Sequence, residues 1–295
     1  MNDAGKLIKQ AGELLARLER LLPGESAPTD WNASVAFRWR KRNGKGVIEP
    51  VRHVHRIGLK DLRGIDAQKQ LVEQNTRQFV DGHPANNVLL TGARGTGKSS
   101  LIKALLNRYA AKGLRLIEVE KSDLVDLADI VDRVSERPER FIIYCDDLSF
   151  EADESGFKAL KVVLDGSVAA ASENCVIYAT SNRRHLMPEY MSENLEYKHV
   201  GDEIHPGETS EEKISLSERF GLWVSFYPFD QDDYLKIVAV WLEHFKAPGA
   251  HTEAVQRAAL QWALARGSRS GRVAWQFARD WAGRERMKAE GGRQK

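Results

Sequence analysis

The sequence lacks the features that mark secreted, membrane-spanning and disulfide-stabilised proteins. It has two cysteines in 295 residues, Cys145 and Cys175, and both lie in short apolar runs. Two buried thiols favour a reducing compartment, so we expect a cytoplasmic protein. No run approaches the roughly 18 apolar residues of a membrane helix, and charged residues interrupt the N-terminal apolar positions. We therefore expect neither a membrane span nor a signal peptide.

Zinc-ligand spacing and the common nucleophile motifs are also missing. The closest approach to a ligand pair is His53-x-His55, and nothing nearby completes a coordination set. No Gly-x-Ser-x-Gly turn or cysteine-nucleophile signature occurs, so the sequence does not indicate a metal other than Mg²⁺ or a covalent hydrolase. The net charge is only +2. Basic ends around an acidic middle suit self-association or an anionic partner, although solvated charge explains them equally well.

What the sequence does contain is a glycine-rich loop after an apolar run. Residues 92–99 read Gly-Ala-Arg-Gly-Thr-Gly-Lys-Ser and directly follow a strand-like segment at 88–91. A strand, a glycine turn and a helix form the setting of a phosphate-binding P-loop. The glycines let successive backbone N–H groups face phosphate oxygens. We expect the loop to bind ATP through Gly92, Ala93, Arg94, Gly95, Thr96, Gly97, Lys98, Ser99 and Ser100.

Four side chains supply the charges and the ligands that phosphate chemistry needs. Lys98 adds a positive charge for the β- and γ-phosphates, and the Ser99 hydroxyl is suited to bind Mg²⁺. About 50 residues later, the apolar run at 141–145 ends in Asp146 and Asp147. Ligands bind at the carboxyl ends of parallel strands. Asp146 is therefore predicted to orient Mg²⁺ through water, and Asp147 to polarise the attacking water.

Strand and helix patterns alternate from about residue 60 to residue 229. Apolar runs separated by amphipathic segments predict a parallel sheet covered by helices on both faces. The five expected strands are residues 88–91, 114–119, 141–146, 175–181 and 222–226. Three helical stretches follow, at residues 232–245, 252–265 and 270–288. The sequence thus predicts an α/β core at 60–229 and a helical lid with a basic tail at 230–295.

Residues 1–59 are predicted to form an N-terminal extension. A heptad-like helix is expected over residues 4–22, either packed on its own domain or docked on a partner. Residues 38–45 carry five cations and no acid, beside Phe37, Trp39 and Trp31. This pattern fits either a solvated face or nucleic-acid binding, with bases stacked on the rings. A long polar connection at 184–214 is a second candidate for binding a protein partner.

In this order the motifs resemble those of AAA+ ATPases. From Gly64-Ile65-Asp66 through the P-loop to Ser217-Glu218-Arg219-Phe220, the chain resembles one bacterial AAA+ family catalogued as a domain of unknown function. The match covers about residues 60–285. It implies an AAA+ type P-loop NTPase with a five-stranded parallel sheet, helices on both faces, a C-terminal α-helical lid and an N-terminal helical extension.

The resemblance also assigns roles to residues outside the P-loop. Gly64 and Ile65 match the turn that packs against adenine, and Asn182 matches sensor 1, which holds the water with the second acid. Arg219 matches the arginine finger that reaches a neighbour's γ-phosphate, and Arg272 matches sensor 2, which contacts the phosphates. A local ion pair for Arg219 and a helix cap for Arg272 are the structural alternatives.

An arginine finger acting in trans implies a homo-oligomer. The simplest arrangement is a head-to-tail ring, and AAA+ relatives suggest six subunits. Three further arginines near the site, Arg94, Arg183 and Arg184, are interpreted as solvated side chains or inter-subunit contacts rather than as catalysts.

One residue departs from the AAA+ pattern, which has Asp-Glu where this chain has Asp146-Asp147. Aspartate is one methylene shorter, and a displacement of about 1 Å costs on the order of 100-fold in rate. The predicted function is Mg²⁺-dependent ATP hydrolysis coupled to the remodelling of a protein or nucleic-acid partner. The alternatives are a nucleic-acid loader, a nucleotide switch with little hydrolysis, and a small-molecule kinase.

Overall fold

A computed structural model describes residues 28–42, 44–149, 155–165, 173–182, 198–200, 203–205 and 218–291. The helix expected over residues 4–22 lies outside the described residues, as does most of the connection at 184–214. Within that connection, β7 (Lys198–Val200) and β8 (Glu203–His205) form an antiparallel pair. None of the described helices is long and apolar enough to cross a membrane.

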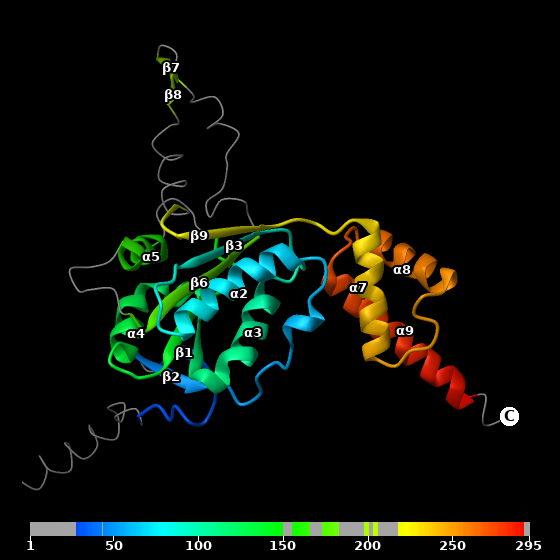
Figure 1. The fold of residues 1–295 in the computed structure, drawn as a ribbon, viewed down its shortest axis with the longest axis horizontal. Coiled ribbons are helices and arrows are strands. Elements are labelled where there is room, and N and C mark those ends of the chain that lie inside the picture. Colours follow the sequence, from blue (N-terminus) through cyan, green and yellow to red (C-terminus); the bar gives the residue numbers. More distant parts are fainter. Residues whose placement is uncertain are drawn as a thin grey trace, which may run out of the picture.

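One seven-stranded sheet, in the order β2-β1-β4-β5-β6-β3-β9, forms the centre of the fold (Figure 1). Continuous apolar runs, as expected for strands buried on both faces, form five neighbouring strands of this sheet, from β4 to the edge strand β9. They are β3 (Val88–Gly92), β4 (Leu114–Val119), β5 (Arg140–Cys145), β6 (Cys175–Ser181) and β9 (Leu222–Phe226). Every neighbouring pair among these five strands is parallel. The predicted fold class is therefore confirmed.

The sheet is two strands wider than predicted. β1 (Ala36–Arg42) runs parallel to β4, and β2 (Lys45–Pro50) pairs antiparallel with β1. In β1 the aromatic residues Phe37 and Trp39 alternate with Arg38 and Arg40, which is the two-residue period of a strand. The aromatic side chains are buried on one face and the arginines are exposed. The basic stretch is thus a strand of the sheet, paired on both sides, and not a separate linker.

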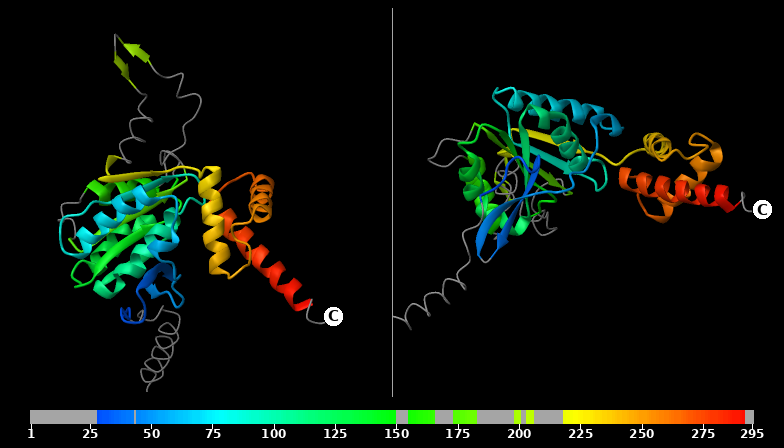
Figure 2. Two further views of the ribbon diagram at one scale, coloured as in Figure 1. Left: turned by 45° about the vertical axis from the view of Figure 1, so that its right-hand side comes forward. Right: turned by 90° about the horizontal axis from the view of Figure 1, so that it is seen from below.

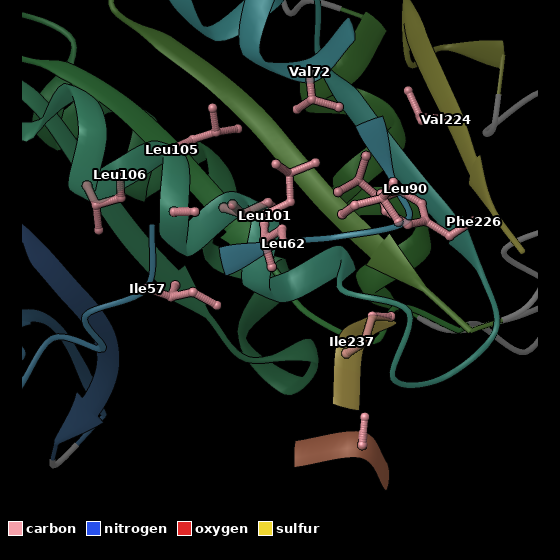
Figure 3. Close-up of a cluster of buried hydrophobic side chains, with 14 of the residues drawn as sticks. Ile57, Leu62, Val72, Leu90, Leu101, Leu105, Leu106, Val224, Phe226 and Ile237 are labelled. Atoms are coloured by element: carbon pink, nitrogen blue, oxygen red, sulfur yellow. The ribbon is translucent and has the colours of Figure 1, made fainter. Parts of the chain in front are cut away.

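Helices cover both faces of the sheet. On one face lie α2 (Asp66–Val80) and α3 (Lys98–Tyr109), and on the other lie α4 (Leu127–Val134) and α5 (Ser155–Asp165). Side chains of β3 alternate between the two layers, since Leu90 packs with the α2–α3 side and Leu89 with the α4–α5 side. Figure 3 shows Val72 of α2 and Leu101 of α3 beside Leu90. Short 3-10 turns are η1 (Leu59–Asp61), η2 (Ala110–Lys112) and η3 (Lys121–Asp126).

Three helices after the last strand form a lid beside the α/β core (Figure 2). They are α7 (Gln231–His244), α8 (Glu253–Ala265) and α9 (Gly271–Gly291). The Asp230 side chain caps α7 by accepting the Asp233 N–H at 2.8 Å, as helix N-termini prefer. Apolar residues of the lid, among them Ile237, belong to the same buried cluster as Leu101 and Phe226. The lid is therefore packed against the core on the α2–α3 side.

The two cysteines are not bonded to each other. Cys145 is buried, as expected, whereas Cys175 at the start of β6 is only partly buried.

Candidate functional site

The loop between β3 and α3 has a backbone conformation that its glycines make accessible. Gly92, Gly95 and Gly97 have φ angles of 119°, 75° and 101°, a region that favours glycine. A Cβ on Gly92 would lie 1.9 Å from the carbonyl oxygen of Phe226 in β9. Within the loop, the Thr96 hydroxyl donates to the Ala93 carbonyl at 2.8 Å. The predicted P-loop therefore lies against the end of β9, and Ser100 lies in the first turn of α3.

Lys98 points back into this loop. Its Nζ donates to the carbonyl oxygens of Gly92 at 2.6 Å and Ala93 at 2.7 Å, and to Asn182 Oδ1 at 3.2 Å. The residue is only 5% exposed. Burial lowers the pKa of Lys98 to about 8, although the carboxylates of Asp147 and Asp146 oppose the shift. A buried cation of this kind favours an anionic ligand at the loop.

Asp146 and Ser99 meet at the C-terminal end of β5. The Ser99 hydroxyl donates to Asp146 Oδ1 at 2.8 Å, and the Thr180 hydroxyl donates to the same oxygen at 2.5 Å. Burial raises the pKa of Asp146, but hydrogen bonds from neighbouring hydroxyls outweigh it and hold the pKa below its ordinary value. A hydroxyl beside an ionised carboxylate provides the oxygen ligands that Mg²⁺ prefers. The predicted pair of residues therefore fits this ion.

Thr180 is a site residue that the sequence reasoning missed. Besides its bond to Asp146, its hydroxyl accepts the backbone N–H of Asp147 at 2.9 Å. It lies two residues before Asn182, so the period of two along β6 could have placed both residues on one face.

The carboxylate of Asp147 lies between two side chains, Asn182 and Arg94. The backbone of Asp147 has φ of 53°, a left-handed conformation that aspartate tolerates better than most residues. Oδ1 accepts a hydrogen bond from Asn182 Nδ2, and Oδ2 lies 3.5 Å from Arg94 Nη2. Because Asn182 also accepts from Lys98, the structure brings the predicted residues Lys98, Asn182 and Asp147 into one connected network.

The start of the lid contacts the loop directly. The Gly271 N–H donates to the Gly95 carbonyl at 2.8 Å. A Cβ on Gly95 would lie 2.8 Å from Ser270 Oγ and 3.3 Å from Arg272 Cβ. The predicted sensor residue Arg272 therefore lies beside the P-loop, close enough that its charge contributes to the lowered pKa of Lys98.

Gly64 and Ile65 lie between the loop and the lid. Gly64 has φ of 73°, and a Cβ there would lie 3.0 Å from the Phe229 ring. Ile65 Cδ1 would lie 3.4 Å from a Cβ on Gly97. Ile65 and Phe229 are both buried, which makes an apolar wall where the adenine was expected. Phe229 was missed because nothing in its spacing distinguishes it from other aromatic residues after a strand.

Arg219 lies apart from this network, directly before β9. Its Nε forms an ion pair with Asp165 at the end of α5, and its side chain is 22% exposed. The local ion pair is the structural alternative anticipated for this residue. The role predicted for Arg219 at the active site of a neighbouring subunit therefore stays a prediction.

The basic stretch in β1 does not have the surface expected of a nucleic-acid site. The rings of Phe37 and Trp39 are buried, so the predicted stacking of bases on them is wrong. Trp31 packs on the Phe37 ring at a centroid distance of 4.8 Å. The cations are paired with carboxylates at 2.6–3.0 Å, as Arg38–Glu118, Arg40–Glu120, Lys41–Asp126 and Arg42–Glu49. In the described part of the chain, no group of three or more His, Cys, Asp or Glu gathers as a metal-binding cluster.

Comparisons with known proteins agree with this geometry. A family model described as "Protein of unknown function (DUF815)" matches residues 32–285, and no curated protein matches the sequence. The structure is similar to Aeropyrum pernix Orc1 in complex with DNA, with 18% identity and a TM-score of 0.51 over 72% of this chain and 58% of that chain.

Two further solved structures are similar over about the same share of this chain. A chain of the E. coli MS115-1 HORMA:CdnC:Trip13 complex is 12% identical, with a TM-score of 0.46 over 75% of this chain and 90% of its own. The Thermotoga maritima RuvB Holliday junction branch migration motor is 10% identical, with a TM-score of 0.41 over 76% of this chain and 72% of its own. Of the three, the likeness to Orc1 exceeds a TM-score of 0.5, and it shows the fold.

Proposed function

The chain belongs to the family described as "Protein of unknown function (DUF815)" and has the AAA+ fold, and from this premise we propose that it is a Mg²⁺-dependent ATPase. The observation that carries the proposal is the convergence of five predicted residues at the P-loop. Lys98, Asn182 and Asp147 form one hydrogen-bonded network, and Asp146 joins Ser99 beside it. Phosphoryl transfer needs these parts together: a cation, a metal ligand and a group that positions water.

Each part of the site has one task in this proposal. Backbone N–H groups of the loop and Lys98 bind the β- and γ-phosphates. Ser99 and Asp146 hold Mg²⁺, which neutralises charge on the phosphates when it is bound. Asp147 and Asn182 orient the attacking water, and Asp147 accepts its proton. Gly64, Ile65 and Phe229 enclose the base.

The lid is the element that converts nucleotide binding into movement. Since the Gly271 N–H is bonded to the Gly95 carbonyl, a shift of the loop around the phosphates is passed to the first turn of α9. Arg272 draws the lid toward the phosphate charge. This coupling remodels a macromolecular partner, and we place protein before nucleic acid because the rings of Phe37 and Trp39 in β1 are buried and are not free to stack on bases. Assembly as a homo-oligomeric ring and a cytoplasmic location complete the proposal.

A nucleotide switch with slow hydrolysis is the second candidate. Both carboxylate oxygens of Asp147 already have partners, Asn182 and Arg94. An aspartate held in this way is less available to activate water than a free glutamate.

ATP turnover per subunit, measured over a range of protein concentrations beside Lys98→Ala, tests the proposal. Turnover that rises with concentration supports active sites completed between subunits. Turnover that is measurable but independent of concentration contradicts the ring. If the protein binds ATP but turns over no faster than Lys98→Ala, the switch is the correct function. If it binds ATP no better than Lys98→Ala, the proposed function is wrong.

A further inference from the structure

Arg94 places a full positive charge in the middle of the phosphate-binding loop. Its side chain is 75% exposed, and its Nη2 lies 3.5 Å from Asp147 Oδ2. The two residues follow different strands, Arg94 in the loop after β3 and Asp147 at the end of β5, and β6 lies between these strands. The Arg94 side chain therefore extends from the P-loop to the end of β5.

The contact closes a chain of polar groups. Lys98 donates to Asn182, Asn182 donates to Asp147, and Arg94 faces the remaining oxygen of Asp147. Lys98 and Asn182 are the groups expected to face the third phosphate. Arg94 and Asp147 therefore border the position of the γ-phosphate rather than that of the α- or β-phosphate.

We propose that Arg94 is a sensor of the γ-phosphate that exchanges one anionic partner for another. Without a third phosphate, its guanidinium pairs with Asp147 and offsets the charge of that carboxylate. When ATP binds, the guanidinium moves to the γ-phosphate and releases Asp147 to position water. This inference rests on the proposed function, and it adds that one residue both distinguishes ATP from ADP and controls the catalytic aspartate.

The relative strengths of the two pairs favour this exchange. The Arg94–Asp147 contact is long, single and exposed, with Asp147 54% exposed, and exposed ion pairs of this kind contribute little. A phosphate accepts two parallel hydrogen bonds from a guanidinium, which is a much stronger arrangement. ADP offers no oxygen at the γ position, so it leaves the Arg94–Asp147 pair in place.

The first test is the affinity of Arg94→Ala for a non-hydrolysable ATP analogue and for ADP. We expect the affinity for the triphosphate to fall about tenfold, as for loss of a charge-assisted hydrogen bond, and the affinity for ADP to change less than about twofold. Arg94→Lys keeps the positive charge but lacks the paired N–H donors of the guanidinium. Its affinity for the triphosphate is therefore expected to lie between those of the wild type and Arg94→Ala. Arg77→Ala, an exposed arginine on α2, is the control and leaves both affinities unchanged.

The second test is a double-mutant cycle with Asp147→Asn. Removing the Asp147 carboxylate reduces its repulsion of the triphosphate both in the wild type and in Arg94→Ala. In the wild type it also frees the Arg94 guanidinium to bind the triphosphate. The gain in triphosphate affinity is therefore expected to be about threefold or more larger in the wild type than in Arg94→Ala. Equal gains would overturn the exchange, and equal losses of ATP and ADP affinity in Arg94→Ala would overturn the sensor. Failure of the wild type to bind ATP would instead remove the proposed function.

Discussion

Gly95 is the residue through which the P-loop touches the lid. Its φ of 75° lies in the left-handed region, and a Cβ would lie 2.8 Å from Ser270 Oγ and 2.9 Å from Ser270 Cβ. No side chain can be added here without moving the start of α9. Glycine is therefore required twice, for the conformation of the loop and for the close approach of the lid.

Gly95→Ala is expected to weaken nucleotide binding by about 10- to 100-fold, because the methyl group separates the loop from Ser270 and misplaces both. Gly267→Ala is the matched control. Gly267 also has a positive φ, 63°, but a Cβ there meets nothing within 4 Å. Both variants should lose about 1–2 kcal/mol of unfolding free energy through backbone strain. Titration with a fluorescent nucleotide measures the affinity of each variant, which should fall in Gly95→Ala and not in Gly267→Ala. Equal affinities in the two variants would contradict the lid contact.

At the scale of elements, β1 shows how an internal strand of a sheet can be hidden in a basic sequence. Trp39 is 2% exposed, and its indole N–H donates to Asp126 Oδ2 at 2.9 Å. The Arg133 guanidinium lies 4.9 Å from the centre of the same ring. Trp39 thus connects β1 with η3 and α4.

Trp39→Ala is expected to lower the free energy of unfolding by about 3–5 kcal/mol, the range for removal of a buried aromatic side chain. Trp39→Phe keeps most of the packing and loses the bond to Asp126, which costs about 1 kcal/mol. Denaturant titration measures both. The triple serine variant of Arg40, Lys41 and Arg42 changes exposed residues of the same segment and should change stability little. Wild-type stability of Trp39→Ala would mean that β1 is not part of the core.

At the scale of the whole molecule, the cation predicted to act as an arginine finger lies apart from the P-loop of its own chain. Lys98, Arg94 and Arg272 surround the P-loop, whereas Arg219 pairs with Asp165 at the end of α5. If Arg219 serves a neighbouring subunit, two different inactive chains should complete each other.

Mixing Arg219→Ala with Lys98→Ala tests this complementation. We expect Arg219→Ala to bind ATP without supplying a finger, and Lys98→Ala to supply the finger while binding ATP poorly. We expect each variant alone to hydrolyse ATP at least about 1,000-fold more slowly than wild type, as for loss of an arginine finger. The mixture should recover a measurable fraction of wild-type turnover. A mixture no more active than its components would contradict action in trans, and Asp165→Asn then tests a purely structural pair.

The sequence by itself determined the parts whose information is local. Eight consecutive residues specify the P-loop, since its glycines set the backbone and Lys98 and Ser99 follow at fixed spacing. Continuous apolar runs located five of the seven strands of the sheet, and helical periodicity placed α7, α8 and α9 within a few residues of their observed bounds.

The tertiary structure decided what depends on segments that are far apart in the chain. Pairing of β1 with β2 and β4 made a basic stretch part of the sheet, and the Arg94–Asp147 contact joins residues 53 positions apart. The approach of Ser270 to Gly95 depends on how the lid packs on the core. Local propensity specifies an element and the direction of its side chains, but the partner of each side chain is fixed only when the elements pack together.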